Sequence, residues 1–221
     1  MIATNFSIGK AISFGWDLMK KHWLVMIGIM IGFNVVTSII SLFGGTDRYS
    51  FWFWMVNIFV LILNYAYLAG YLKLYLNATD GEEPEFDVFK KTVKKVPGLI
   101  VLFILYTIAI LIGLCLLIIP GIWLMIRLYY APLIYLDREK CSIEEAYRES
   151  FRITKGHVWQ LIGLNLASIG VALLGFLVCI VGVFPATVVC YFAYTASYRM
   201  LQYQEGHPVA QNISENPERQ I

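Results

Sequence analysis

Arg127 is the residue whose type and position most clearly suggest chemistry. It lies midway along an apolar stretch between Pro120 and Asp137. A charge at the centre of a bilayer costs at least about 2.5–3.5 kcal/mol on insertion scales, so such residues usually face a protein interior or a wet cavity. Because a guanidinium donates two hydrogen bonds to one phosphate, Arg127 is a candidate site for an anion or a lipid headgroup. The alternative is a side chain that reaches the outer headgroups or pairs with backbone carbonyls at Pro132.

The segment from residue 86 to residue 96 combines an apolar face with a basic one. Its apolar residues recur at helical spacing and are Phe86, Phe89, Val93 and Val96. Its basic residues are Lys90, Lys91, Lys94 and Lys95. Such a helix can lie in the membrane interface and attract anionic lipid, with about 1 kcal/mol from each basic residue near the surface. These lysines are therefore candidate lipid-surface residues. Alternatively they only fix the orientation of the chain, and nearby acids such as Glu83 and Glu85 weaken the attraction.

Residue types that are typical of catalytic or metal sites are scattered. The three histidines, His22, His157 and His207, belong to no metal-binding motif, and none of the four cysteines forms a CxxC pair. The chain contains no phosphate-binding loop and no nucleophile elbow. We therefore expect a non-enzymatic protein without a cofactor or a metal site. The net charge of +2 is too small to suggest nucleic acid as a partner.

Long apolar stretches are the elements that must hold these residues. Hydrophobic residues make up 59% of the chain and charged residues 14%, against about 45–50% and 25% in soluble domains. A helix needs roughly 20 apolar residues to cross a bilayer. The sequence therefore predicts an all-α polytopic membrane protein with six transmembrane helices, at about 23–44, 51–76, 99–119, 121–136, 158–180 and 182–200. They form one domain over residues 1–201, followed by a disordered cytoplasmic tail over residues 202–221.

Basic residues fall in every second gap between these stretches. Lysines precede the first span, and further clusters lie between the second and third spans and between the fourth and fifth. The opposite loops hold only Arg48. Because cytoplasmic loops carry the excess of Lys and Arg, both termini are expected in the cytoplasm. Lys73 and Arg199 lie near the cytoplasmic ends of their spans, so we expect their long side chains to reach the interface.

An internal similarity suggests that the chain is built from repeated units. At an offset of 135 residues, Ser7 and Ala11 recur as Ser142 and Ala146, together with five other identities. Both copies run from a polar amphipathic stretch into a span, and the segment 86–96 follows the same plan more loosely. We therefore predict three membrane hairpins, each preceded by a cytoplasmic amphipathic helix.

Small and amide side chains within the spans indicate contacts between helices. Gly28 and Gly32 form a GxxxG pattern, which lets helices approach closely within a protein or between protomers. The sequence is therefore compatible with a homo-oligomer or a membrane-protein partner. Four asparagines also lie in the spans, where amides can hydrogen-bond between helices; they are Asn34, Asn57, Asn64 and Asn165.

The segment from Ile119 to Gln160 carries a motif that resembles a known family. Its residues are Ile119-Pro120-Gly121-Ile122, Arg127, Ala131-Pro132, Ala146, Ser150, Lys155-Gly156 and Trp159. The motif resembles that of a group of uncharacterised six-helix bacterial and archaeal integral membrane proteins, related to the membrane domain of some glycerophosphodiester phosphodiesterases. The resemblance implies a six-helix fold in the cytoplasmic membrane of a prokaryote. It does not imply the phosphodiesterase reaction, because we expect no room in this chain for a separate catalytic domain.

The motif also has a structural interpretation that needs no ligand. Pro120 and Gly121 would form the turn before the fourth span, and Pro132 would kink that span. The small residues Ala146 and Ser150 would share one face of a helix, and Gly156 would end that helix.

Two functions from different classes fit these features. The first is a lipid-interacting protein with a membrane-organising or accessory role, whose partners are membrane lipids, anionic ones included. The second is a small transporter or export component for an anionic or amphipathic substrate. Its polar path would use Arg127, the asparagines of the spans and inner tyrosines such as Tyr106 and Tyr191.

Overall fold

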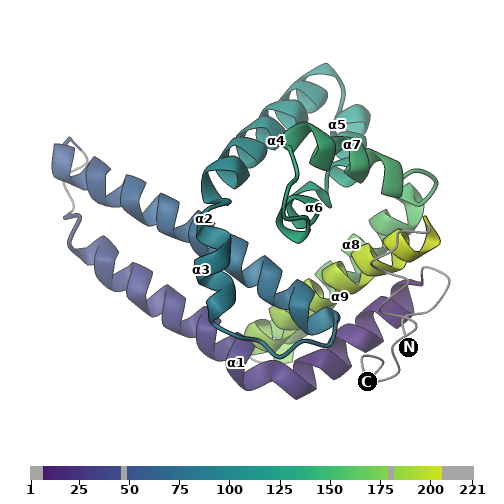
Figure 1. Cartoon of the computed structure of the whole chain (residues 1–221), viewed down its shortest axis with the longest axis horizontal. Coiled ribbons are helices and arrows are strands. Elements are labelled where there is room, and N and C mark those ends of the chain that lie inside the picture. The colour runs from purple at the N-terminus through teal and green to yellow at the C-terminus, as the bar shows by residue number, and fades with distance from the viewer. Residues whose placement is uncertain (1–6, 46–48, 179–181, 206–221) are drawn as a thin grey trace.

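The computed structural model describes residues 7–45, 49–178 and 182–205, and the regular elements within them are helices (Figure 1). In chain order they are α1 (Ile8–Leu42), α2 (Phe51–Thr79), α3 (Asp87–Val93), α4 (Val96–Leu116), α5 (Ile118–Arg127), α6 (Ala131–Asp137), α7 (Ile143–Ile153), α8 (Val158–Val178) and α9 (Val183–Gln204). Gln202 is a buried residue of α9, which corrects the predicted start of the tail at this residue. The rest of the predicted tail, residues 206–221, lies outside the described residues.

Five stretches are long and apolar enough to cross a membrane. They are Ile8–Leu42, Phe51–Thr79, Val96–Leu116, Ile118–Asp137 and Val158–Leu177. These stretches coincide with five of the six predicted spans. The predicted span 182–200 corresponds to α9, which is not among these five stretches and carries polar residues such as Thr195 and Arg199 in its second half. The arrangement of six spans in three hairpins therefore stays a prediction.

The helix α1 is continuous over 35 residues, so the predicted amphipathic segment and the first span are one element. At about 1.5 Å per residue it is about 52 Å long, well beyond the thickness of a bilayer core. Its buried residues all lie at or before Met26 and recur on one face, at Ala11, Gly15, Leu18, Met19, His22 and Met26. The outer half of α1 and the first half of α2 form an arm that projects from the rest of the molecule (Figure 1).

The fourth span is broken in the middle. It consists of α5 and α6, and the break lies between Arg127 and Ala131, with Pro132 in the first turn of α6 as the predicted kink requires. The turn before the span differs from the prediction. Leu117 has an extended backbone with φ −164° and separates α4 from α5, whereas Pro120 lies inside the first turn of α5. A proline is well tolerated there because the first amides of a helix have no partner within the helix.

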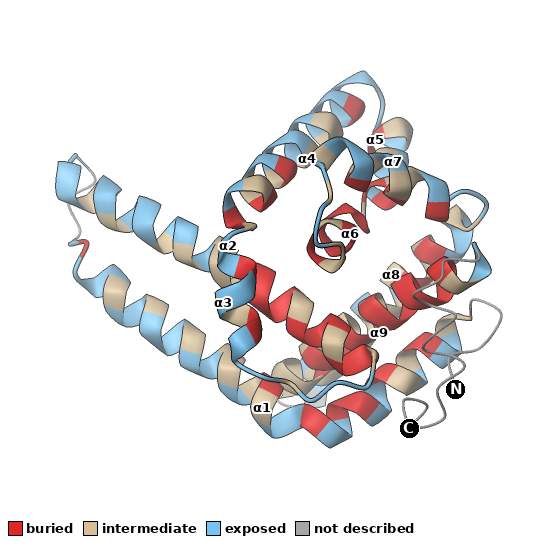
Figure 2. Ribbon diagram, viewed as in Figure 1, coloured by how far each residue is buried: buried red, intermediate tan, exposed pale blue. Residues whose placement is uncertain are grey.

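The core of the molecule is centred on α9. Buried residues concentrate on α9, on the second half of α2 and on α6, whereas the arm is mostly exposed (Figure 2). The first half of α1 packs along α9, and Gly15 allows a close approach, because a Cβ there would lie 2.9 Å from the Val189 carbonyl oxygen. Large apolar side chains on the arm are exposed, as at Leu42 and Phe51. Such a surface is stable in lipid and costly in water.

Candidate functional site

Arg199 is the centre of a buried charged cluster at one end of the bundle. Its guanidinium binds Asp80 with distances of 2.8 and 2.5 Å, and it binds Asp137 with distances of 2.7 and 3.0 Å. The Arg199 side chain is 2% exposed. Lys73 lies 3.6 Å from Asp137, so two acidic and two basic side chains balance one another within the cluster. We name these four residues the Arg199 cluster.

Three helices meet at the Arg199 cluster. Asp80 follows the last residue of α2, Asp137 ends α6, and Arg199 comes from the second half of α9. Buried charges are tolerated only when they are paired and hydrogen-bonded, and the planar guanidinium fork satisfies two carboxylates at once. Burial raises the pKa of the Asp80 carboxyl, and the Arg199 guanidinium acts in the opposite direction. The cluster therefore joins the ends of α2 and α6 to α9.

This cluster corrects the expectation that Arg199 reaches the membrane interface. The prediction was wrong because the acidic partners lie 119 and 62 residues away in the sequence, where no local pattern connects them. Both acids stand immediately at the ends of apolar stretches, and this shared position is the signal that the sequence did offer. Lys73 is only partly buried.

Hydroxyl and amide groups extend the cluster along α9. Tyr198 donates to Asp137 at 3.2 Å, and Gln202 donates to the Tyr198 hydroxyl at 2.6 Å while accepting from Arg199. The hydroxyls of Thr79 and Thr195 are 2.7 Å apart. These buried polar groups are thus satisfied within the protein, as stability in an apolar surrounding requires. The arrangement suits a structural junction between helices.

Arg127, the sharpest candidate from the sequence, lies away from this cluster. Its Nη1 donates to the carbonyl oxygen of Phe151 at 2.8 Å, and its guanidinium lies 4.7 Å from the centre of the Trp123 ring. The Nε atom is buried and has no hydrogen-bond partner within the described residues. Arg127 therefore pairs with a backbone carbonyl, as one alternative expected, although this carbonyl belongs to α7 and not to the break at Pro132. Its role toward an anion stays a prediction.

The small residues of the motif fix α7 against α5. The Ser150 hydroxyl donates to the Arg127 carbonyl oxygen at 2.7 Å. Together with the hydrogen bond from the Arg127 side chain to the Phe151 carbonyl, it joins α5 to α7 in both directions. Ala146 and Ser150 are both fully buried and share one face of α7. Gly156 follows the end of this helix with φ +86°, a left-handed conformation that favours glycine. The structural interpretation of Ala146, Ser150 and Gly156 is consistent with these positions.

Gly121 acts through close packing. A Cβ at Gly121 would lie 2.8 Å from the backbone nitrogen of Leu114, and a Cβ at Gly113 would lie 2.9 Å from the Gly121 Cα. The helices α4 and α5 therefore touch through their backbones at this point. Gly28 and Gly32 differ, because a Cβ at either residue would meet no described atom within 4 Å. The GxxxG pattern makes no close contact within the described chain.

The lysines of the segment 86–96 divide into two groups. Lys95 is half-buried, and its ammonium donates to the carbonyl oxygens of Tyr135, Leu136 and Arg138, with distances of 3.2, 3.3 and 2.5 Å. A cation at this place satisfies the last carbonyls of α6 and complements the helix dipole. Burial lowers the pKa of Lys95. Lys95 therefore stabilises a helix end and is not free to meet a lipid surface.

The other three lysines, Lys90, Lys91 and Lys94, are exposed. They accompany exposed apolar side chains, since Phe86 is 69% exposed and Val93 56%. The predicted apolar face of this segment was partly wrong. The buried residues of α3 are Val88 and Thr92, while Phe86 and Val93 face away from the protein. We name the exposed set of three lysines with Phe86 and Val93 the α3 surface.

A cavity of about 470 Å³ lies among α2, α4, α6, α8 and α9. It is lined by Leu68, Leu72, Phe103, Tyr106, Tyr129, Pro132, Ser168, Ala172, Thr187, Cys190, Tyr191 and Tyr194. The wall is apolar and aromatic, with hydroxyl groups and no charged side chain among these residues. The break in the fourth span brings Tyr129 and Pro132 to the cavity. We name it the tyrosine-lined cavity.

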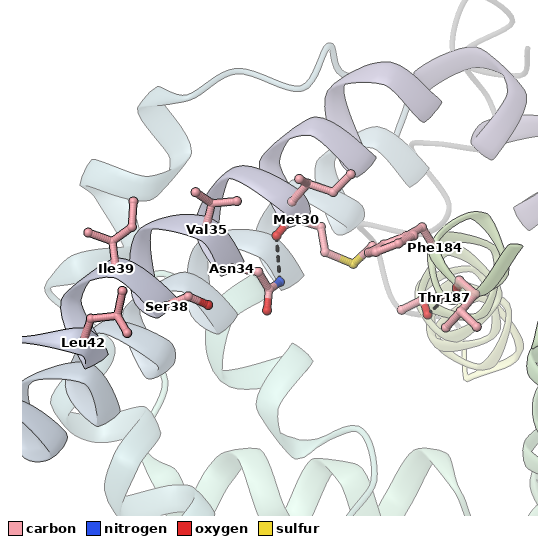
Figure 3. A pocket seen from close by; sticks show the side chains of 10 residues that line it. Met30, Asn34, Val35, Ser38, Ile39, Leu42, Phe184 and Thr187 are labelled. Carbon is pink, nitrogen blue, oxygen red and sulfur yellow. Dashed lines mark hydrogen bonds between the residues drawn. The ribbon is translucent and has the colours of Figure 1, made fainter. Parts of the chain in front are cut away.

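A second hollow, of about 610 Å³, is an open groove between the outer half of α1 and the start of α9 (Figure 3). Its polar groups are satisfied locally. Asn34 donates to the Met30 carbonyl oxygen at 2.8 Å within α1, and Thr187 donates to its own helix at Val183. The side-chain amides of the other predicted span asparagines also donate to carbonyls four residues earlier, in Asn57, Asn64 and Asn165. The side-chain NH2 groups of these asparagines therefore donate within their own helices and do not form the hydrogen bonds that were expected between helices.

Metal chemistry finds no support in the described part of the chain. Within those residues no three His, Cys, Asp or Glu side chains come together as a metal site would require. The polar sites described above are the charge-balanced Arg199 cluster and Arg127, which binds the Phe151 carbonyl. Together with five apolar stretches of spanning length, they define an integral membrane protein made of helices.

The chain belongs to the family described as the membrane domain of glycerophosphoryl diester phosphodiesterase. The family model matches residues 90–203, which is just over half of the chain; the match begins within α3 and ends in the last turn of α9. This confirms the resemblance drawn from the motif around Pro120 and Pro132. No curated protein and no solved structure is significantly similar to the chain.

Proposed function

We propose that this protein is a non-enzymatic, lipid-interacting membrane protein with an organising or accessory role, and that it meets anionic lipid through the α3 surface. The observation that carries the proposal is the exposure of Lys90, Lys91 and Lys94 beside Phe86 and Val93. Basic and apolar side chains that are exposed together suit the headgroup region, where apolar groups insert and ammonium groups meet phosphates.

The balance of charge favours weak rather than tight lipid attraction. Each exposed lysine near an anionic leaflet contributes about 1 kcal/mol. Lys90 is partly neutralised because its ammonium lies 3.0 Å from Asp87, and Glu85 is exposed nearby. Lys95 makes no contribution because it is held by the end of α6. The proposal therefore predicts enrichment of anionic lipid around the protein, not a permanently bound lipid.

The proposed orientation places the α3 surface at the cytoplasmic leaflet of a prokaryotic cytoplasmic membrane, with both termini on the same side. The positive-inside rule supports this orientation. The Arg199 cluster and Lys95 both lie at helix ends that the same orientation puts on the cytoplasmic side, where buried polar groups are less costly than at the bilayer centre.

Lipid enrichment can be measured by native mass spectrometry of protein released from nanodiscs that contain phosphatidylglycerol and phosphatidylcholine. The triple variant Lys90→Gln, Lys91→Gln, Lys94→Gln should retain less phosphatidylglycerol than the wild type. A matched control, Lys10→Gln, Lys20→Gln, Lys21→Gln, removes three exposed lysines from the first half of α1. If both variants lose the same amount of phosphatidylglycerol, the net charge of the protein and not the α3 surface determines lipid retention. Unchanged retention in the first variant would refute the role of the α3 surface.

A second candidate function is a small transporter or export component. The observation that favours it is the break of the fourth span at residues 128–130, beside the tyrosine-lined cavity. Discontinuous helices next to a cavity near the middle of the spans are typical of transporter sites. Saturable flux into proteoliposomes that depends on the cavity would support this function, whereas an accessory protein should give no saturable flux.

A further inference from the structure

Three residues that line the tyrosine-lined cavity carry hydroxyl groups that no part of the described protein satisfies. Tyr194 donates to the Tyr129 carbonyl oxygen at 2.6 Å, and the Cys190 thiol donates to the Ser168 carbonyl oxygen at 3.4 Å. The side-chain hydroxyls of Tyr129, Ser168 and Tyr191 have no hydrogen-bond partner among the described residues. Three donors therefore line a cavity whose other walls are largely apolar.

The position of the cavity makes these free hydroxyls significant. Ser168 lies in the middle of α8, and Phe103 and Tyr106 lie in the middle of α4. The cavity is thus distant from both ends of these spans. In hydrocarbon an unpaired hydroxyl is costly because no lipid tail can accept its hydrogen bond. The Tyr191 ring is held in place by stacking on Tyr75 at 5.2 Å, so its hydroxyl cannot readily turn to a partner elsewhere.

Charge limits what the cavity can hold. None of its lining residues is charged, so an anionic headgroup would lose its hydration there without gaining a counter-ion. The volume of about 470 Å³ falls within the range of small-ligand pockets. A suitable occupant has an apolar body and uncharged hydrogen-bond acceptors at its polar end.

From these features we infer that the tyrosine-lined cavity is a binding site for a neutral glycerolipid, whose ester carbonyls accept hydrogen bonds from Tyr191 and the neighbouring free hydroxyls. The acyl chain lies against Leu72, Phe103 and Ala172. This site differs from the α3 surface, which meets anionic headgroups at the membrane surface, and it stands whether or not the α3 surface binds lipid.

The experiment uses the full-length protein in phosphatidylcholine nanodiscs with a diacylglycerol that carries a photoactivatable diazirine in one acyl chain. Crosslinked peptides are mapped by mass spectrometry. We expect saturable labelling of α8 and α9 around Ser168 and Tyr191, displaced by unlabelled diacylglycerol and not by the same concentration of phosphatidylglycerol. Labelling that is unsaturable, or that phosphatidylglycerol displaces equally well, would overturn the assignment of a neutral ligand. The absence of labelling would refute the binding of a diacylglycerol in this cavity.

Two variants and two matched controls connect the labelling to the cavity. Ala172→Phe fills the cavity and should abolish saturable labelling, whereas Val101→Phe introduces the same aromatic side chain at a lipid-exposed position of α4 and should not. Tyr191→Phe keeps the ring and removes the hydroxyl, so affinity should fall about fivefold, the value of one neutral hydrogen bond. Tyr65→Phe removes a hydroxyl outside the cavity.

If Ala172→Phe does not fold, the affinity of the Tyr191→Phe variant still tests the proposed site. Unchanged affinity in a folded Tyr191→Phe protein would refute the proposed hydrogen bond, and unchanged labelling in a folded Ala172→Phe protein would refute the site. The triple lysine variant of the α3 surface should label like the wild type, so the outcomes for the two lipid sites stay distinguishable.

Discussion

Arg199 binds Asp80 through two parallel hydrogen bonds, from Nε to Oδ1 at 2.8 Å and from Nη2 to Oδ2 at 2.5 Å. The pair fixes the end of α2 against α9 although its members lie 119 residues apart. The same guanidinium holds Asp137 at the end of α6. One side chain thus secures the mutual position of three helices.

Replacing Arg199 by Met should therefore be strongly destabilising. Removal of one partner from a buried ion pair leaves uncompensated charge and typically costs about 3–5 kcal/mol. Arg199→Lys should be intermediate, because an ammonium keeps the charge and loses the bidentate fork. Unfolding of the purified protein in detergent, followed by thermal scanning or by titration with a denaturing detergent, measures the difference.

Lys140→Met is the matched control for this prediction, because it removes one positive charge from an exposed residue that forms no ion pair with the described residues. Its stability should stay close to that of the wild type. Equal stability of Arg199→Met and Lys140→Met would contradict a structural role for the Arg199 cluster.

Two glycines of α1 should respond in opposite ways to the same substitution. At Gly15 a new methyl group would lie 2.9 Å from the Val189 carbonyl oxygen and 3.0 Å from the Ala193 nitrogen. Because backbone atoms of α9 cannot move aside cheaply, Gly15→Ala should cost about 1–3 kcal/mol. Gly28→Ala meets open space and should be neutral or stabilising by up to about 1 kcal/mol through helix propensity. Thermal unfolding of both variants measures the difference in stability, and equal destabilisation would argue against the close contact between α1 and α9 at Gly15.

Ser150 and Arg127 should be energetically coupled. Ser150→Ala leaves the half-buried Arg127 carbonyl without its donor and should cost about 1–3 kcal/mol. Arg127→Gln removes the hydrogen bond in the other direction, to Phe151. Since both bonds hold α5 to α7, the double variant should lose less stability than the sum of the single variants. Strict additivity in this double-mutant cycle would show that the two hydrogen bonds act independently.

The stability of α7 should fall at acidic pH through Glu149. Burial raises the pKa of this carboxyl, but the guanidinium groups of Arg152 and Arg138 lower it by more, so the pKa lies below its usual value. For an acid with a lowered pKa in the folded state, stability is fully present above the unfolded pKa of about 4.3 and is lost as the pH falls through the folded pKa.

Hydrogen exchange of α7 amides between pH 6 and pH 3, corrected for intrinsic rates, should therefore show falling protection in the acidic range. Glu149→Gln should lower protection at pH 6 and flatten this part of the profile. Glu144→Gln serves as the control, since its partner Arg148 forms an ion pair that is 80% exposed on both sides and contributes little. A profile that Glu149→Gln leaves unchanged would disprove this origin of the pH dependence.

Hydropathy predicted the membrane-spanning stretches well because crossing a bilayer depends on local composition. The central motif was also informative, since Pro132 and Gly156 act on their own backbone wherever the chain places them. By contrast, α1 proved continuous because nothing in its sequence interrupts a helix between the amphipathic part and the span. The internal similarity links this part of the chain to the segment around α7, where Gly156 does follow the end of a helix before the span begins.

The partners of charged residues were not predictable by the same route. Arg199 and Lys95 each meet groups at least 40 positions away, and a hydropathy profile assigns both to the membrane surface. The tyrosine-lined cavity was predicted only in part. Tyr106 and Tyr191 were expected along one polar path with Arg127, whereas the packing of five helices places both tyrosines at a cavity that Arg127 does not line.

The unbroken course of α1 also has a mechanical consequence. Its first half is fastened to α9, whereas beyond Met26 no residue of α1 is buried (Figure 2). A helix without a proline or a bulge transmits a tilt along its whole length. A small rotation of the first half of α1 against α9 would therefore move the far end of the arm through a larger arc, together with the part of α2 that packs beside it through the stacking of Phe33 on Tyr67.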